Sequence, residues 1–149
     1  MGNGTDADGN MGVFLRKNVI ETAGAALRAN LTRLAPRVLP WRELARAAAD
    51  PKRVPDFTTA FDTFLLHTGG RGVLDALQKA LSLDDAAMRH SRAALARFGN
   101  TSAASLWYVL AHVEAFAGVK KGQRFLGVSF GGGFKCNSMC LRAARAVPA

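Results

Sequence analysis

Apolar residues recur in the first part of the chain at the spacing of one buried helical face. Asn18 and Glu21 form a capping-box-like pair where this run begins. Pro36 and Pro40 follow the run, and because proline disrupts a helix interior, we expect the helix to end there. The apolar positions fall three or four residues apart, at Ile20, Ala23, Leu27, Leu31 and Leu34.

A strand, a glycine turn and a helix are predicted in the middle of the chain. Before them, residues 41–49 predict a short amphipathic helix, and residues 50–56 predict a turn-rich connector. Residues 63–67 have the length and composition of a buried strand. From Gly70 onward the periodicity changes to that of a helix, with apolar residues at Val73, Leu74, Leu77 and Leu81.

The second half of the chain predicts two more helices. The first covers about residues 84–96, with Ser82 and Asp85 as a capping pair. Thr101 or Ser102 can cap the second helix. The buried face of that helix is marked by Leu106, Leu110 and Val113.

The remaining segments predict strands. Residues 124–130 read as a strand, three glycines break it, and residues 134–143 predict a closing strand or a short helix. Residues 1–10 predict a flexible lead-in or a hairpin turn, followed by a short strand over 13–15. We therefore expect a lead-in over 1–10 and one α/β layered domain over 11–149.

Composition and charge narrow the class of protein. Apolar residues make up 49% of the 149 residues, which excludes a disordered tail. Lysine and arginine exceed aspartate and glutamate by 20 − 11 = 9, a balance that suits phosphate-bearing partners. The basic residues are scattered, and no zinc-finger, RNP or basic-zipper pattern accompanies them, so a nucleic-acid-binding module is disfavoured. A solvated basic surface explains the charge as well.

The cysteine pattern and the hydropathy exclude several kinds of site. Cys136 and Cys140 have no histidine neighbours, which argues against a zinc site or a disulfide framework and favours reduced thiols in a cytosolic setting. We expect no metal. No run of eighteen apolar residues and no signal-peptide pattern occur, so no transmembrane segment is expected in this chain.

His67 is the first candidate for chemistry, because it follows the predicted strand. In open α/β sheets, ligands collect at the carboxyl ends of strands. From this place the ring can donate a hydrogen bond from Nε2 to an oxygen that becomes negative during a reaction. Gly69 and Gly70 would allow a substrate to approach the backbone closely. The alternative is a core histidine bonded to a carbonyl.

Asn100 and a run of glycines are the second and third candidates. The turn RFGNTS places Asn100 ahead of the next helix, where its amide can also donate to an oxyanion. A turn residue or an N-cap is the alternative. Gly131, Gly132 and Gly133 suit close packing against a narrow ligand channel, although they match no P-loop or dinucleotide fingerprint.

Three motifs taken together resemble a known family. HTGGR, RFGNTSAASLWYVL and FGGGFKCNS occur in the order and spacing of the C-terminal part of plant 3-ketoacyl-CoA synthases. These are the condensing enzymes that elongate very-long-chain fatty acids at the endoplasmic reticulum membrane. The resemblance covers about Gly12 to Arg142. It implies a thiolase-like layered α-β-α fold, a duplicated βαβαβ arrangement of which this chain supplies the second half.

The resemblance also implies a reaction and a role for the matching residues. In the family, a cysteine takes the acyl group from acyl-CoA, malonyl-CoA loses carbon dioxide, and the enolate attacks the thioester to give a 3-ketoacyl-CoA. His67 and Asn100 match the paired donors that hold the malonyl thioester oxygen as it gains negative charge. No bound cofactor is implied; the substrates are acyl-CoA and malonyl-CoA.

Departures from the family pattern qualify this expectation. Thr63 and Ala96 stand where the family has other residues, and the ending reads FGGGFKCNSMCLRAARA. The family's nucleophilic cysteine lies in the N-terminal half, and Cys136 matches a different family cysteine. We therefore expect the chain alone to be inactive, and to be cytosolic or peripheral to the membrane.

Two kinds of partner follow from a half-domain. A complementary synthase half would restore a complete enzyme, or copies of this chain would associate through the apolar surface that a half-domain exposes. The alternative function is a noncatalytic half-domain that binds or modulates full-length synthases.

Overall fold

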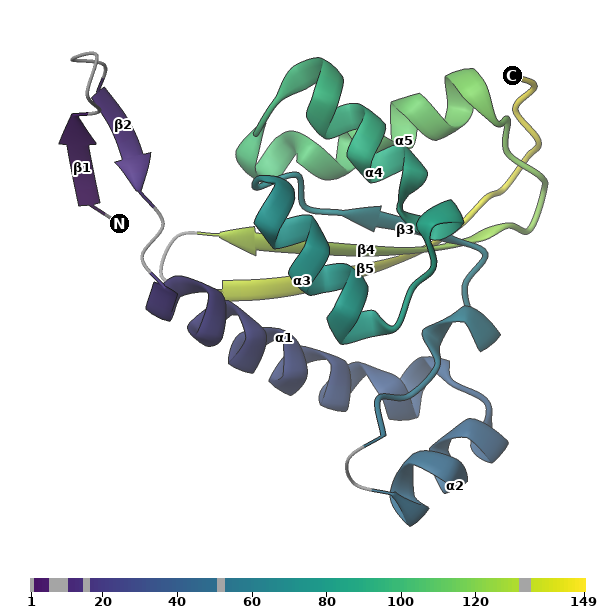
Figure 1. Ribbon diagram of the computed structural model, residues 1–149. Coiled ribbons are helices and arrows are strands. Elements are labelled where there is room, and N and C mark those ends of the chain that lie inside the picture. Colours follow the sequence, from purple (N-terminus) through teal and green to yellow (C-terminus); the bar gives the residue numbers. More distant parts are fainter. Residues whose placement is uncertain (1, 6–10, 15–16, 51–52, 132–134) are drawn as a thin grey trace.

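The computed structural model describes residues 2–5, 11–14, 17–50, 53–131 and 135–149 (Figure 1). Two short strands, five α-helices and a three-stranded sheet make up this part of the chain. In chain order the strands and α-helices are β1 (Gly2–Thr5), β2 (Met11–Phe14), α1 (Lys17–Val38), α2 (Trp41–Ala49), β3 (Thr63–Leu66), α3 (Arg71–Leu81), α4 (Asp85–Phe98), α5 (Ser105–Phe116), β4 (Arg124–Gly131) and β5 (Lys135–Arg142). Short 3-10 turns precede β3 and α5, at Phe57–Thr59 and Ser102–Ala104.

The sheet has the order β3-β4-β5. β3 runs parallel to β4, so that Phe64 lies opposite Leu126, and β5 returns antiparallel to β4. The predicted strands over 63–67 and 124–130 are confirmed. For residues 134–143 the sequence left a strand or a helix open, and residues 135–142 form a strand; Phe134 lies outside the described residues.

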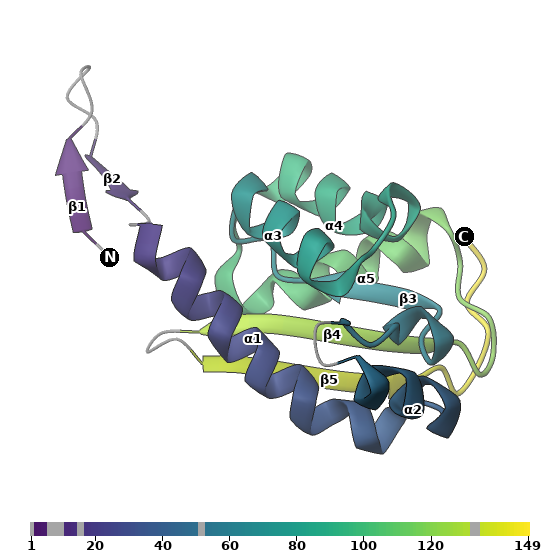
Figure 2. The ribbon, with the colours of Figure 1, turned by 60° about the horizontal axis from the view of Figure 1, so that its bottom comes forward.

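Side chains of β3 alternate between two hydrophobic clusters, one on each face of the sheet. Phe64 and Leu66 pack with α1 and α3, whereas Leu65 packs with the buried residues of α5. Figure 2 shows α1 crossing in front of β4 and β5 with α5 behind them. Helices on both faces of the sheet give the layered α-β-α arrangement that was expected.

The free edge of β3 is covered by α4. The Ser91 hydroxyl of α4 accepts a hydrogen bond from the backbone N–H of Leu66 over 3.1 Å, and Ser91 is fully buried. A buried backbone N–H without a partner would be costly, so this contact lets the edge strand lie inside the protein. The same hydrogen bond fixes the last residue of β3, which directly precedes His67.

α1 ends at Val38, between Pro36 and Pro40, the two prolines that were expected to end it. The helix continues through Pro36 to Val38, and the backbone N–H of Leu39 still bonds to the carbonyl of Ala35 over 3.0 Å. Pro36 lies in the last turn, so it removes only one helical hydrogen bond there. Burial of the apolar face of this end, including Ala35 and Leu39, outweighs that loss.

Three predicted caps also differ from the structure. Asp84, not Ser82, caps α4 by accepting the N–H of Ala87; Ser82 instead ends α3 in a left-handed conformation. α4 extends to Phe98, beyond the expected end near residue 96. Neither Thr101 nor Ser102 caps the helix that follows, because the 3-10 turn Ser102–Ala104 leads directly into α5 and Ala104 is the residue before the helix. Asx and serine side chains near each boundary are all competent caps, and packing selects among them.

Residues 2–5 and 11–14 form an antiparallel hairpin at the start of α1, apart from the three-stranded sheet (Figures 1 and 2). The flexible lead-in predicted over 1–10 falls partly on residues 1 and 6–10, which lie outside the described residues. Within the described part of the chain, no helix is long and apolar enough to cross a membrane.

Candidate functional site

His67 lies at the carboxyl end of β3. Its backbone N–H bonds to the carbonyl of Val128 over 3.0 Å, which extends the parallel pairing by one residue beyond the strand. The residue is only 8% exposed. Burial lowers the pKa of His67 below its ordinary value, because a charged ring would lose hydration there. The ring is therefore neutral at neutral pH.

The Nδ1 side of this ring faces two hydroxyl groups. Ser105 Oγ lies 3.1 Å from Nδ1 and Ser129 Oγ lies 3.4 Å from it. Phe130 packs edge to face against the ring at a centroid distance of 5.9 Å. The alternative expected for a core histidine, a bond to a carbonyl, is not among the ring contacts in the described part of the chain.

The Nε2 side of the ring lies against Gly69. A Cβ atom at residue 69 would stand 2.9 Å from Cδ2 and 3.0 Å from Nε2 of His67, closer than such atoms approach. Only glycine leaves this side of the ring open. Gly70 has φ +141°, a conformation that disfavours other residues, and it precedes the first turn of α3.

Asn100 reaches the same turn from the loop between α4 and α5. Its Nδ2 donates to the carbonyl of Gly69 over 3.2 Å, and its Oδ1 accepts the backbone N–H of Ser102 over 2.8 Å. These two contacts determine the orientation of the amide. Nδ2 carries a second N–H, for which no partner occurs among the described residues. Asn100 therefore accepts a backbone N–H through Oδ1, as a capping residue does, and still has an N–H of Nδ2 available to donate.

The two loops are also joined directly. Thr68 Oγ1 donates to the carbonyl of Gly99 over 3.3 Å, and Gly99 takes φ +67° where α4 ends. The structure therefore brings His67 and Asn100 to the same glycine, although 33 residues separate them in the sequence (100 − 67). The ring is mostly buried and the amide is exposed.

The third glycine motif does not contribute in the same way. Gly131 is exposed, and a Cβ atom there would meet nothing within 4 Å. Gly132 and Gly133 lie outside the described residues. No other described part of the chain packs against Gly131, and the expected close approach of a ligand to these glycines stays a prediction.

Neither cysteine is suited to act as a nucleophile. Burial raises the pKa of Cys136 to about 11, and burial likewise raises the pKa of Cys140. A thiol attacks as its thiolate, which is scarce at neutral pH for such groups. Within the described part of the chain, no three His, Cys, Asp or Glu side chains gather in a way that could hold a metal ion.

Sequence reasoning missed Ser105 and Ser129 as partners of His67. Ser105 lies four and eight residues before Val109 and Val113, so it shares their buried helical face, and all three are 0–1% exposed. A hydroxyl on an apolar helical face needs a buried partner, which was the available signal. Ser129 lies on β4 beside the glycine run and carried no comparable signal.

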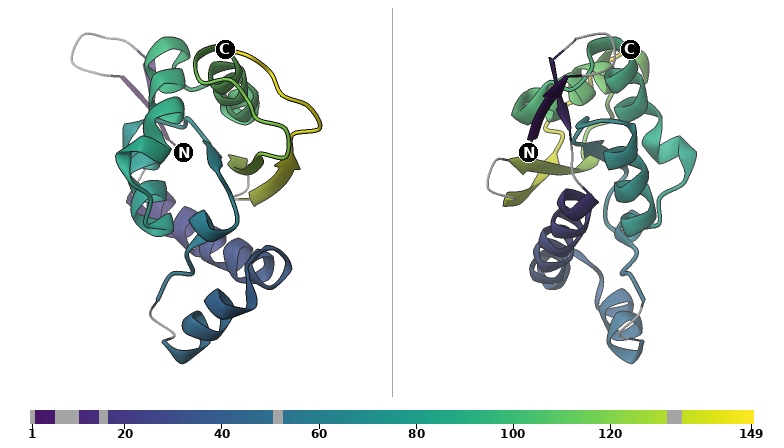
Figure 3. Two further views of the ribbon diagram at one scale, coloured as in Figure 1. Left: turned by 90° about the vertical axis from the view of Figure 1, so that its right-hand side faces the viewer. Right: turned by 60° about the vertical axis from the view of Figure 1, so that its left-hand side comes forward.

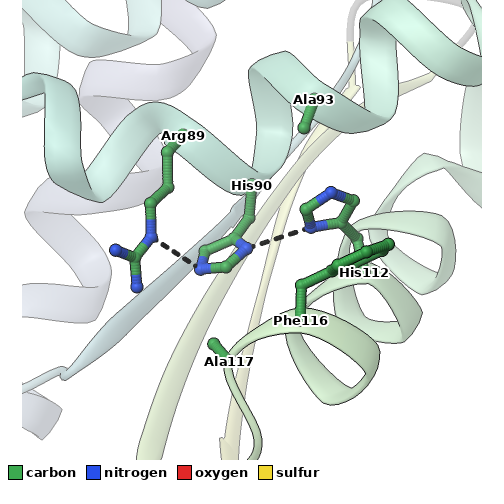
Figure 4. A pocket seen from close by; sticks show the side chains of 6 residues that line it. All are labelled: Arg89, His90, Ala93, His112, Phe116 and Ala117. Carbon is green, nitrogen blue, oxygen red and sulfur yellow. Dashed lines mark hydrogen bonds between the residues drawn. The ribbon is translucent and has the colours of Figure 1, made fainter. Parts of the chain in front are cut away.

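A separate histidine cluster lies between α4 and α5. Figure 4 shows Arg89 Nε donating to His90 Nε2 over 2.9 Å, and His90 Nδ1 lying 3.1 Å from His112 Nδ1. Because Arg89 Nε only donates, His90 Nε2 must accept, its Nδ1 carries the proton, and His112 Nδ1 accepts it. These residues line a surface depression of about 420 Å³ with Ala93, Phe116 and Ala117. The depression includes neither His67 nor Asn100.

Comparisons with known proteins identify similar chains. The family model described as 3-oxoacyl-[acyl-carrier-protein (ACP)] synthase III C terminal matches residues 58–143, and that described as FAE1/type III polyketide synthase-like protein matches residues 2–52. Probable 3-ketoacyl-CoA synthase 20 of Oryza sativa subsp. japonica is 48% identical over 97% of this chain. Probable 3-ketoacyl-CoA synthase 14 of Arabidopsis thaliana is 46% identical over 97%. The chain spans only 30% and 34% of these two relatives.

Solved structures show the same fold. The 1,3,6,8-tetrahydroxynaphthalene synthase of Streptomyces coelicolor A3(2), a bacterial type III polyketide synthase, superposes with a TM-score of 0.62 at 27% identity, covering 96% of this chain and 36% of that one. A 3-oxoacyl-(acyl-carrier-protein) synthase III superposes with a TM-score of 0.60 at 21% identity, covering 93% of this chain and 37% of the other. The thiolase-like fold and the resemblance to the C-terminal part of 3-ketoacyl-CoA synthases are thus confirmed. The chain belongs to the condensing-enzyme family that the 3-oxoacyl-[acyl-carrier-protein] synthase III C-terminal model describes.

Proposed function

We propose that this chain is the oxyanion-donor half of a 3-ketoacyl-CoA synthase that condenses acyl-CoA with malonyl-CoA. The observation that carries the proposal is the convergence of His67 and Asn100 on Gly69 from two separate loops. The product would be the 3-ketoacyl-CoA of very-long-chain fatty acid synthesis, made at the endoplasmic reticulum membrane.

In the proposed reaction the two donors act on the thioester oxygen of malonyl-CoA. The bond to the carboxylate breaks, carbon dioxide leaves, and the electron pair becomes an enolate whose oxygen is held by His67 Nε2–H and Asn100 Nδ2–H. The enolate carbon then attacks an acyl thioester on a cysteine, whose thiolate leaves. A neutral imidazole suits this role, because it can donate a hydrogen bond without giving up its proton.

The cysteine in this scheme is supplied by a complementary half. The raised pKa values of Cys136 and Cys140 support this division, since neither thiol is activated. We therefore expect these 149 residues by themselves to form no acyl-enzyme through either cysteine.

The surface where the complementary half would pack is the aromatic face of α4 and α5, defined by Phe98, Trp107 and Tyr108. These side chains are 41–56% exposed, and the rings of Phe98 and Tyr108 lie 4.9 Å apart. Exposed aromatic clusters of this kind mark interaction surfaces.

Reconstitution tests the proposal. The chain is co-expressed with the N-terminal part of a similar 3-ketoacyl-CoA synthase and assayed with acyl-CoA and labelled malonyl-CoA. Each of His67→Ala and Asn100→Ala should slow product formation by roughly 10²–10³-fold, the effect of removing one oxyanion donor. Lys79→Ala, at an exposed position of α3, is the control and should retain the rate. Full activity in both site variants would overturn the proposal.

The aromatic face also favours a second candidate, a noncatalytic half-domain that binds and modulates full-length synthases. The same variants separate the two functions. If the chain acts by binding alone, His67→Ala will alter a full-length synthase as the unmodified chain does. If it supplies the donors, that variant will be inactive in reconstitution although it still binds.

A further inference from the structure

We propose that Ser105 is a positioning residue that holds His67 in the tautomer with its proton on Nε2. This inference rests on the proposed function, in which Nε2–H faces the reacting oxygen. Ser105 is the first residue of α5 and His67 the last paired residue after β3, so the contact joins a helix to the end of a strand.

The direction of the Ser105–His67 hydrogen bond follows from the burial of Ser105. Ser105 is fully buried, and its Oγ lies 3.1 Å from His67 Nδ1. No other partner of this hydroxyl occurs among the described residues. If Nδ1 carried the proton, the serine hydrogen would have no acceptor and would be buried unpaired, which is costly. When the serine donates to Nδ1, both groups are satisfied.

Ser129 is a weaker partner of the same nitrogen. Its Oγ lies 3.4 Å from Nδ1, and the residue is only half-buried, so its hydroxyl can bond to water instead. Ser105 lacks that freedom. Two hydroxyls therefore face Nδ1, but only the buried one is obliged to donate to it.

The consequence appears on the opposite side of the ring. A neutral imidazole with an accepting Nδ1 carries its proton on Nε2, beside Gly69 and the Asn100 loop. In the other tautomer, Nε2 would present a lone pair to the same place and would repel a developing oxyanion. Ser105 thus acts through His67 and does not itself touch the substrate.

The test is nitrogen NMR of the chain labelled with ¹⁵N-histidine. The sequence has three histidines, and each is assigned by a His→Gln variant. His67 should give the pattern of the Nε2–H tautomer, whereas His90, which accepts from Arg89, should give the Nδ1–H pattern. The same spectrum therefore contains an internal reference for the opposite tautomer. An Nδ1–H pattern for His67 would overturn the inference without reference to any activity.

Variants assign the effect to Ser105. Ser105→Ala should lower the tautomer ratio of His67 by up to about ten-fold, the value of one neutral hydrogen bond, so that its two ¹⁵N shifts move toward each other. Ser105→Thr should restore the ratio, and Ser129→Ala should change it less. An unchanged ratio in a folded Ser105→Ala chain would contradict the proposal. If Ser105→Ala does not fold, the tautomer ratio of His67 in Ser129→Ala decides between the two serines. A change in that ratio as large as the effect of about ten-fold expected for Ser105 would assign the role to Ser129 and overturn the proposal.

The activity of the reconstituted enzyme provides a second, separate test of the role of Ser105. Ser105→Ala should lower kcat and leave KM for malonyl-CoA near that of the unmodified chain. If the NMR result is as expected but His67→Ala leaves the rate unchanged, the proposed function fails while the positioning role stands.

Discussion

At the scale of single residues, the site depends on the absence of a side chain. Gly69 lies beside the His67 ring, so closely that a Cβ atom would stand 2.9 Å from Cδ2, and its carbonyl accepts the hydrogen bond from Asn100 Nδ2. A methyl group there would have to displace the ring, which Ser105 holds in place. Gly69 is thus required by contact distance, whereas Gly70 is favoured by its positive φ.

We expect Gly69→Ala to destabilise the fold by about 1–3 kcal/mol, the usual cost of overpacking. Gly72→Ala is the matched control, because a Cβ there meets nothing within 4 Å and residue 72 lies in α3. It should be neutral or stabilising by up to about 1 kcal/mol. Urea denaturation measures both. Equal stability of the two variants would mean that the ring yields easily.

At the scale of elements, α4 takes part in two polar arrangements, one with β3 and one with α5. Ser91 serves the edge of β3, and His90 joins Arg89 to His112 across the two helices. In the second arrangement each neutral ring accepts on one nitrogen. A further proton on His90 would place an N–H against the donating Nε of Arg89.

The arrangement around His90 makes the free energy of unfolding depend on pH. Burial, then the charges of Arg89 and His112, lower the pKa of His90 below 6.5 in the folded chain. The unfolded chain therefore takes up a proton first, and stability is lost as pH falls below 6.5 toward the folded value. His67, whose pKa burial also lowers, contributes with the same sign.

Urea midpoints measured on both sides of pH 6.5 check this. Arg89→Met should make the decline shallower, because removing the guanidinium lets His90 accept a proton more easily. Arg92→Met is the control, since Arg92 pairs with Asp75 and Gln78 and contacts neither ring. A midpoint that rises on acidification would contradict the assignment.

At the scale of the whole molecule, the aromatic face of α4 and α5 lies on a chain that spans about a third of its relatives. Burying one such side chain contributes about 1.5–3 kcal/mol. In the absence of a complementary half, copies of the chain can cover this face for one another.

We expect the isolated chain to self-associate with rising concentration, as measured by sedimentation. Trp107→Gln should weaken this association by roughly ten- to a hundred-fold in the dissociation constant. Trp41→Gln is the control, because Trp41 on α2 is even more exposed, at 73%, but lies outside the aromatic face. A compact monomer at all concentrations would exclude the face as a pairing surface.

Much of the fold could be predicted, because local periodicity carries it. The strand over 63–67 and the helix from Gly70 were readable from a short apolar run, two glycines and positions spaced for one helical face. The continuation of α1 through Pro36 was not, since the penalty of Pro36 is local whereas the packing of Leu39 that offsets it comes from distant residues. The predicted caps at Ser82, Thr101 and Ser102 were wrong for the same reason, because distant packing decides where each helix begins.

The sequence by itself determined which residues can do the chemistry: a histidine after a strand, an asparagine in a turn, and glycines that allow close approach. Only the tertiary structure decided that these groups meet at Gly69, that Ser105 lies behind the ring, and that burial raises the pKa of both thiols. Residue type sets what a group can donate or accept. Its neighbours set its burial, its direction and its protonation, and for the His67 ring those neighbours come from up to 62 residues away.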